Sequence, residues 1–182
     1  MEGRSKNAPV LNRNLLGGTS EYGPQSNADK KVVVQIVNIF EASEAFLEHA
    51  KHPEITSSVA RLCNNAEIVR IWHDQIQFKP PKVGGPTGWH QDFPAWPILQ
   101  PADLISAWVA LDDAEIDNGC MWMVPGSHRW GKLPQEALAD PLAPHPAEIL
   151  VTGPAGTVIV MNAHLWHGGT ANRTATARRA VH

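Results

Sequence analysis

The chain has 182 residues, 43% hydrophobic and 18% charged, with a formal net charge of −3, which favours one globular domain with a sizeable core. This charge gives no electrostatic reason to expect a nucleic-acid partner, and no apolar run reaches the roughly 18 residues of a membrane span. Only two cysteines are present, and the N-terminus has no signal-peptide pattern, so we expect a cytoplasmic protein.

The first part of the chain predicts an arm, a strand and two helices. Residues 1–28 are polar and lack periodicity, so we expect a loosely ordered arm, followed by one folded domain over residues 29–182. Residues 30–40 are rich in β-branched side chains and predict a strand. Residues 41–50 and 52–63 predict short helices, the second with Pro53 in its first turn. Residues 66–78 alternate in character and predict one or two strands.

The second part of the chain predicts further short strands. Residues 106–113 predict one strand, and Asn118-Gly119 predicts a two-residue hairpin leading into the strand of residues 120–124. Residues 156–161 form an apolar run and predict a strand buried on both faces. Residues 171–182 predict a last strand. Short strands separated by turns, with helices only near the start, favour an all-β sandwich or barrel.

The stretch WHQDFPAW, residues 89–96, raises the question of a metal site. His90 and Asp92 point to the same face of a strand, although a lone His-x-Asp is more often an exposed polar pair than a ligand pair. His167, which follows residues 156–161 and precedes two glycines, supplies a third ligand. Two histidines and one carboxylate leave positions open, as in non-haem Fe(II) oxygenases. His164 competes for the third position, but we favour a rim position for it.

A 2-oxo acid bound at the open positions would need a buried cation for its far carboxylate. Arg178 and Arg179 lie on the last predicted strand. Consecutive strand residues face opposite ways, so at most one of these arginines points inward. The pattern of alternation does not say which one.

Three stretches together resemble the phytanoyl-CoA dioxygenase (PhyH) family of Fe(II)- and 2-oxoglutarate-dependent oxygenases. They are FKPPKVGGPTGWHQDFPAWP, DNGCMWMVPGSH and GTVIVMNAHLWHGGTANRTATARR, and the resemblance covers the chain from about Ile68 onward. It implies a mainly β fold, the double-stranded β-helix or jelly roll, with short N-terminal helices packed on one side. It also implies that His90, Asp92 and His167 bind the iron, and that Arg178 rather than Arg179 anchors 2-oxoglutarate.

The resemblance further implies the reaction: with O2, hydroxylation of an unactivated C–H bond of a small or lipid-like substrate, releasing succinate and CO2. Because Asp92 is present, hydroxylation is favoured over halogenation. Side chains expected beside the cosubstrate are Gln75, Trp108 and Asn172, and those expected at the substrate are Phe93, Trp96 and Trp89. For each of them packing or local hydrogen bonding is the alternative role, and for Trp108 a core position is favoured.

Two other classes of protein remain as alternatives. One is a non-catalytic jelly-roll binding module whose metal site has lapsed, and the other is a cupin-like metalloenzyme that uses no 2-oxo acid. The chain stops four residues after Arg178, whereas the family's last strand continues, so we expect a truncated product or an unusually short strand. The sequence leaves the substrate and the oligomeric state open.

Overall fold

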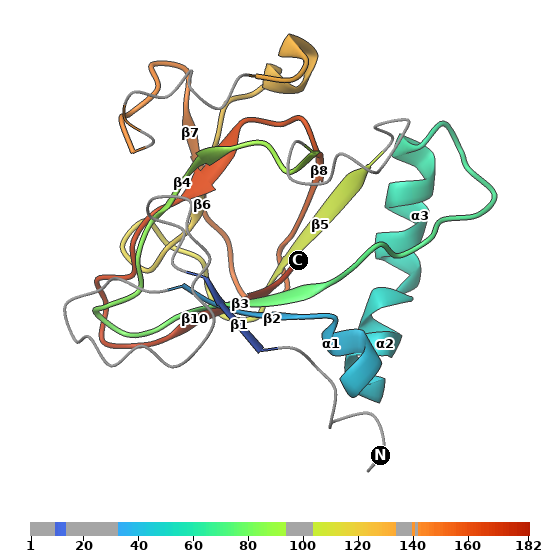
Figure 1. Cartoon of the computed structure of the whole chain (residues 1–182), viewed down its shortest axis with the longest axis horizontal. Helices are drawn as coiled ribbons and strands as arrows, with labels where there is room; N and C mark the ends of the chain where they lie inside the picture. The colour runs from blue at the N-terminus through green and yellow to red at the C-terminus, as the bar shows by residue number, and fades with distance from the viewer. Residues whose placement is uncertain (1–9, 14–32, 94–103, 134–139, 141) are drawn as a thin grey trace.

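The computed structural model describes residues 10–13, 33–93, 104–133, 140 and 142–182 (Figure 1). Within them, two antiparallel sheets face each other. The larger sheet contains, in spatial order, β1 (Val10–Arg13), β2 (Val33–Val37), β3 (Gln75–Lys79), β10 (Arg178–Val181), β5 (Ile105–Ala110) and β8 (Val158–Asn162). The smaller sheet contains β4 (Thr87–His90), β9 (His167–Gly169), β6 (Met121–Met123) and β7 (Ile149–Val151).

The chain crosses repeatedly between the two sheets. β3 lies in the larger sheet, β4 in the smaller one and β5 in the larger one again. After β6 and β7 in the smaller sheet, β8, β9 and β10 continue the alternation. This winding is the double-stranded β-helix, or jelly roll, so the predicted fold is confirmed.

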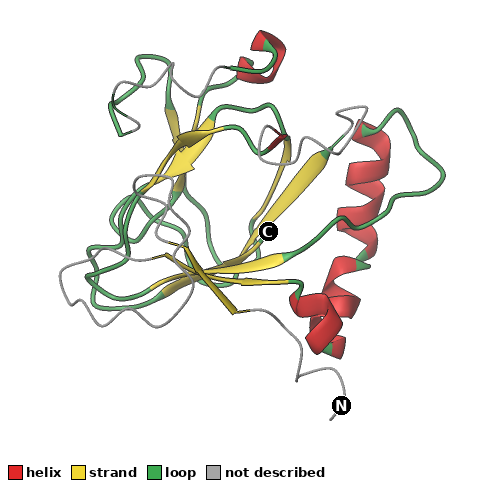
Figure 2. Cartoon of the chain, in the orientation of Figure 1, coloured by secondary structure: helices red, strands yellow, loops and turns green. Residues whose placement is uncertain are grey.

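Three helices precede the crossings and gather on one side of the molecule (Figure 2). They are α1 (Ile39–Ala42), α2 (Glu44–Ala50) and α3 (Pro53–Leu62). α3 begins at Pro53, where a missing backbone N–H leaves no hydrogen bond unmade, and it buries Val59. In the part of the chain that the structure describes, no helix has the length and apolar character needed to cross a membrane.

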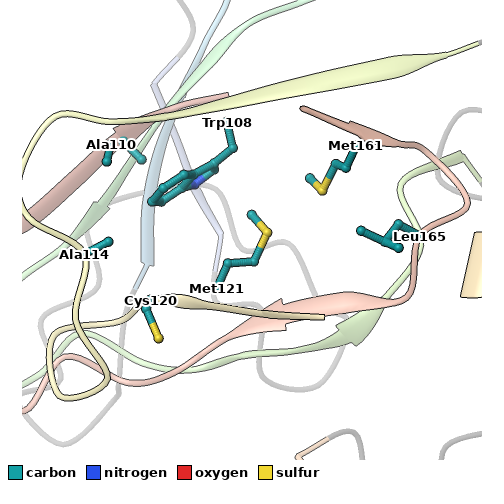
Figure 3. Packing of buried hydrophobic residues seen from close by; sticks show 8 residues of the cluster. Trp108, Ala110, Ala114, Cys120, Met121, Met161 and Leu165 are labelled. Carbon is teal, nitrogen blue, oxygen red and sulfur yellow. The ribbon is translucent and has the colours of Figure 1, made fainter. Parts of the chain in front are cut away.

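The main core fills the space between the two sheets. Figure 3 shows Trp108 of β5, Met121 of β6 and Met161 of β8 pointing toward one another. Each such side chain contributes about 1.5–3 kcal/mol on burial. Because Trp108 also touches the site described below, the core fixes one wall of that site.

The structure corrects one prediction of strand pairing and shortens one predicted strand. Asn118-Gly119 does not form a two-residue hairpin, because β5 and β6 lie in different sheets. Instead, the Asn118 side chain accepts a hydrogen bond from the Glu115 backbone N–H and donates one to the Asp113 carbonyl, which closes a wider turn. Residues 66–74 form no strand, and only β3, from Gln75, is regular.

Two further expectations need correction. The apolar run of residues 156–161 is not buried on both faces. Among the described residues, β8 is an edge strand of the larger sheet, and Val158 is 42% exposed. An apolar run alone does not distinguish an edge strand from a central one. Within the expected N-terminal arm, Val10–Arg13 form β1 and pair with β2, while the remainder of residues 1–28 lies outside the described residues.

Candidate metal and cosubstrate site

His90 and His167 come from distant parts of the chain and meet through sheet register. They are direct partners across the antiparallel β4–β9 pair, and their ring centroids are 4.2 Å apart. Asp92 follows two residues after His90. One possible ligand atom from each of the three side chains lies within 4.8 Å of the others. The three predicted ligands therefore converge on one point.

Backbone carbonyls fix the tautomers of both histidines. His90 Nδ1 lies 2.8 Å from the Gly88 carbonyl oxygen, and His167 Nδ1 lies 2.9 Å from that of Leu165. A carbonyl oxygen only accepts hydrogen bonds, so each Nδ1 carries the proton. Both Nε2 lone pairs are then free for a metal, an orientation typical of histidine ligands.

The Asp92 carboxylate lies between the two histidines and is 7% exposed. Its Oδ1 is 3.6 Å from His90 Nε2 and 3.8 Å from His167 Nε2. Burial alone would raise the pKa of Asp92, but the neighbouring imidazoles outweigh it and hold that pKa well below its usual range. Burial and the nearby His90 lower the pKa of His167 to about 4. Near neutral pH the site thus contains a carboxylate beside a neutral His167.

This donor set fits Fe(II). Two imidazole nitrogens and one carboxylate oxygen on one triangular face leave the remaining coordination positions for other ligands. A closed structural zinc site needs a fourth protein ligand, and the cluster found among the described residues contains only these three. His164 is outside the cluster, and its ring packs instead against Phe93, with centroids 4.8 Å apart.

Two buried cations lie beside the three candidate metal ligands. Arg178 and Lys79 are partners across the β10–β3 pair and are 2% and 1% exposed. They line the same small cavity as His90 and His167. The Lys79 ammonium donates a hydrogen bond to the Thr170 carbonyl. Arg178 Nε and Nη1 are buried and have no partner among the described residues.

The electrostatics of this pair call for an anion. Burial, and then the charge of Arg178, lower the pKa of Lys79 well below its usual range. Burial lowers the pKa of Arg178 to about 10. Unpaired buried charge is costly unless a ligand neutralises it. The cavity is therefore suited to an acidic molecule with a carboxylate at one end, beside Arg178 and Lys79. The other end of that molecule would reach the candidate metal ligands.

Arg179 points the other way. Its Nε and Nη2 donate to the two carboxylate oxygens of Asp112 at 2.9 and 2.7 Å, and its side chain is 55% exposed. Of the two adjacent arginines, Arg178 is thus the one inside the barrel. Strand alternation alone did not decide between them; the family resemblance selected Arg178.

The structure places the predicted cosubstrate neighbours as follows. The Trp108 indole N–H donates to Gln77 Oε1 at 3.3 Å, and the Arg178 guanidinium lies 5.5 Å from the Trp108 ring centroid. Gln75 Nε2 lies 3.3 Å from His182 Nδ1. Asn172 donates to the carbonyls of Lys79 and Thr176 at 3.0 and 2.8 Å, which braces the loop before Arg178.

The side chains predicted to contact the substrate do not gather at one place in the described residues. Trp89 lies on the face of β4 opposite His90, 4% exposed, and stacks on Trp122 and Trp166 with centroids 5.4 and 6.2 Å away. These are the contacts of a packing residue. Phe93 is buried against His164. Trp96 lies outside the described residues, so contact of these aromatics with substrate stays a prediction.

Sequence reasoning did not place Lys79 beside Arg178, and it gave no site role to Ser106 or His182. A usable signal existed for Lys79, because Gln75, Gln77 and Lys79 alternate along one strand and share a face. His182 is four residues after Arg178 and shares its face by the same rule. Ser106 shares the face of Trp108 by this rule, but its hydrogen bond to Asp92 depends on how β5 packs against the loop after β4.

A jelly roll that brings two histidines and one carboxylate to one point has the fold and ligand set of the non-haem iron oxygenases. The model of the phytanoyl-CoA dioxygenase (PhyH) family matches residues 20–180. The chain belongs to this family, as the sequence resemblance predicts.

Curated relatives and solved structures match the chain at moderate sequence identity. A probable alpha-ketoglutarate-dependent hypophosphite dioxygenase of Stutzerimonas stutzeri is 32% identical over 62% of this chain and 43% of its own length. Human peroxisomal phytanoyl-CoA dioxygenase is 26% identical over 93% of this chain and 52% of its own length. The chain thus spans about half the length of these curated relatives. Among solved structures, EctD from S. alaskensis with 2-oxoglutarate and 5-hydroxyectoine superposes with TM-score 0.68 and 27% identity, over 81% of this chain and 54% of that one.

Proposed function

We propose that this chain carries the active site of an Fe(II)- and 2-oxoglutarate-dependent dioxygenase that hydroxylates an unactivated C–H bond. One observation carries the proposal: ligand atoms of His90, Asp92 and His167 lie within 4.8 Å of one another, and His90 and His167 share a cavity with two buried cations. A metal site alone would not need the cations. Together they fit a metal-chelating dicarboxylic acid.

The protein's residues act by binding and orientation. Bound Fe(II) supplies the activation of O2, coupled to oxidative decarboxylation of 2-oxoglutarate to succinate and CO2. His90, Asp92 and His167 hold the metal through three positions. Arg178 and Lys79 receive the far carboxylate of 2-oxoglutarate, and the Trp108 ring supports the Arg178 guanidinium from one side. Burial of Asp92, His167, Arg178 and Lys79 keeps bulk water away from that side of the site, whereas the His90 side chain is 40% exposed.

The substrate is proposed to be a small molecule or acyl compound with a compact apolar part. Relatives are named for hypophosphite, ectoine and phytanoyl-CoA, which differ greatly in polarity. In this chain, a cavity of about 180 Å³ lies between α3, β5 and residues 69–74. Its walls are mainly apolar, and Ser106 and His182, which also face Asp92, form part of them. A cytoplasmic location stays a prediction.

Uncoupled turnover tests the activity. Purified protein with Fe(II), ascorbate and 2-oxoglutarate, but no added substrate, should form succinate slowly, and Asp92→Ala should form none above the protein-free background. Arg179→Ala serves as the control, because it alters an exposed residue of the same strand. Fe(II) binding without 2-oxoglutarate consumption would favour the cupin-like alternative. Absence of metal binding would favour the non-catalytic module.

A further inference from the structure

The imidazole of His182 faces the Asp92 oxygen that points away from the two histidine ligands. His182 Nε2 lies 3.7 Å from Asp92 Oδ2, and the His182 side chain is 9% exposed. This Nε2 is buried and has no hydrogen-bond partner among the described residues. The His182 backbone is fixed next to β10, because its N–H and C=O both bond to Gln75 at 2.8 Å.

A chain of hydrogen bonds determines which nitrogen of His182 carries the proton. The Trp108 indole N–H can only donate, so the Gln77 amide must turn its Oε1 toward it. The Gln77 amide nitrogen then faces His182 Nδ1 at 3.4 Å, and the Gln75 amide nitrogen faces the same atom at 3.3 Å. Amide N–H groups donate, so Nδ1 accepts. The neutral imidazole therefore carries its proton on Nε2, directed at Asp92.

The two oxygens of Asp92 thus have different surroundings. Oδ1 faces the Nε2 atoms of His90 and His167, while Oδ2 accepts a hydrogen bond from Ser106 Oγ at 3.2 Å and faces His182 Nε2. Donors on one oxygen of a ligating carboxylate orient it and favour binding through the other oxygen. At 3.7 Å the contact between His182 Nε2 and Asp92 Oδ2 is longer than a hydrogen bond, and a small rotation of the Asp92 carboxylate would close it.

We propose that His182 and Ser106 are positioning residues that hold Asp92 Oδ2, so that Asp92 binds the metal through Oδ1 alone. A carboxylate binding through both oxygens would occupy one of the positions that the cosubstrate and O2 need. Trp108 and Gln77, which line the cosubstrate cavity, set the proton on His182 and so connect that cavity to the metal ligand. This inference rests on the proposed metal site.

Co(II) binding to the whole chain tests the inference without turnover, by titration and by the intensity of the Co(II) d–d absorption, which falls as coordination number rises. The variants are His182→Phe and Ser106→Ala, which each remove a donor to Oδ2, and His182→Gln, whose amide restores one. The control is His128→Phe, at an exposed histidine outside the site. Thermal unfolding of each metal-free variant checks that it is folded.

We expect His182→Phe and Ser106→Ala to weaken Co(II) binding by about 10- to 100-fold and to weaken its absorption, with His182→Gln within about threefold of wild type. Wild-type affinity and spectrum in folded His182→Phe and Ser106→Ala would overturn the inference. So would a His182→Gln variant as weak as His182→Phe, because packing rather than a hydrogen bond would then be responsible. Failure of the wild type to bind Co(II) would instead contradict the metal site itself.

Discussion

His90 and His167 lie directly opposite each other on β4 and β9, with 4.2 Å between their ring centroids. The meeting of these two candidate ligands is therefore a consequence of strand register. A slip of one residue in this pair would turn one histidine to the far face, where Trp89 packs. Residues that fix the register are as important to the site as the ligands themselves.

Gly168 is the residue of β9 that tests this dependence. A Cβ at this position would lie 2.0 Å from Trp122 Nε1 and 2.6 Å from the Thr87 carbonyl oxygen. We expect Gly168→Ala to destabilise the protein by about 1–3 kcal/mol and to lower metal affinity, because β9 must move away from β4. Denaturant unfolding and Co(II) titration measure the two effects.

Gly169→Ala is the matched comparison. A Cβ there would lie 3.2 Å from Lys79 Nζ and 3.4 Å from the Cys120 carbonyl oxygen, so smaller shifts suffice. This variant should keep more stability and metal affinity than Gly168→Ala, and should mainly weaken 2-oxoglutarate binding. Equal behaviour of the two alanine variants would argue against a register-dependent site.

The adjacent arginines provide a second prediction. Arg178→Ala should raise the Kd for 2-oxoglutarate by about 30-fold or more, because it removes a buried charge partner of the far carboxylate. Arg179→Ala should leave that Kd nearly unchanged, since Arg179 is held outside by Asp112. Calorimetric titration of 2-oxoglutarate into the Co(II)-loaded protein measures both. If the two variants behaved the other way round, the anchor assignment would be wrong.

Lys79→Met should have opposite effects on stability and on binding. The lowered pKa of Lys79 means that folding disfavours its charged form, so at neutral pH the lysine destabilises the ligand-free protein. We expect methionine to stabilise this state by about 1 kcal/mol or more while weakening 2-oxoglutarate binding.

The pH dependence of this effect has a definite sign. As pH rises toward the usual lysine pKa, the lysine loses its charge in the unfolded chain too, and the penalty disappears. The stability gain of Lys79→Met should therefore shrink between neutral pH and about pH 10.5. Thermal unfolding at several pH values measures it, and a gain that grew with pH would contradict the burial of the charged ammonium as the cause.

The sequence predicts the ligands better than their surroundings. Strand alternation identified His90 and Asp92 as neighbours, and the position of His167 between an apolar strand and two glycines made it the third candidate. The family resemblance then selected Arg178 over Arg179. The same alternation places Gln75, Gln77 and Lys79 on one face of a strand, so a site position for Lys79 could also have been predicted. The contact of Ser106 with Asp92 could not, because it depends on how two sheets pack. Tertiary packing likewise decided which apolar strand became an edge.

The turn at Asn118-Gly119 shows a related limit. This dipeptide is a strong local signal for a hairpin, yet hairpin formation requires that the flanking strands pair with each other. Here the jelly-roll crossing sends β5 and β6 to different sheets. Local turn chemistry was therefore correct about the turn and wrong about the pairing.

Anaerobic crystallisation of this chain with Fe(II) and 2-oxoglutarate tests the central claim most directly. The account predicts one metal ion bound by His90 Nε2, Asp92 Oδ1 and His167 Nε2, with the far carboxylate of 2-oxoglutarate on Arg178 and Lys79. Metal bound elsewhere, or 2-oxoglutarate held away from these two cations, would contradict it.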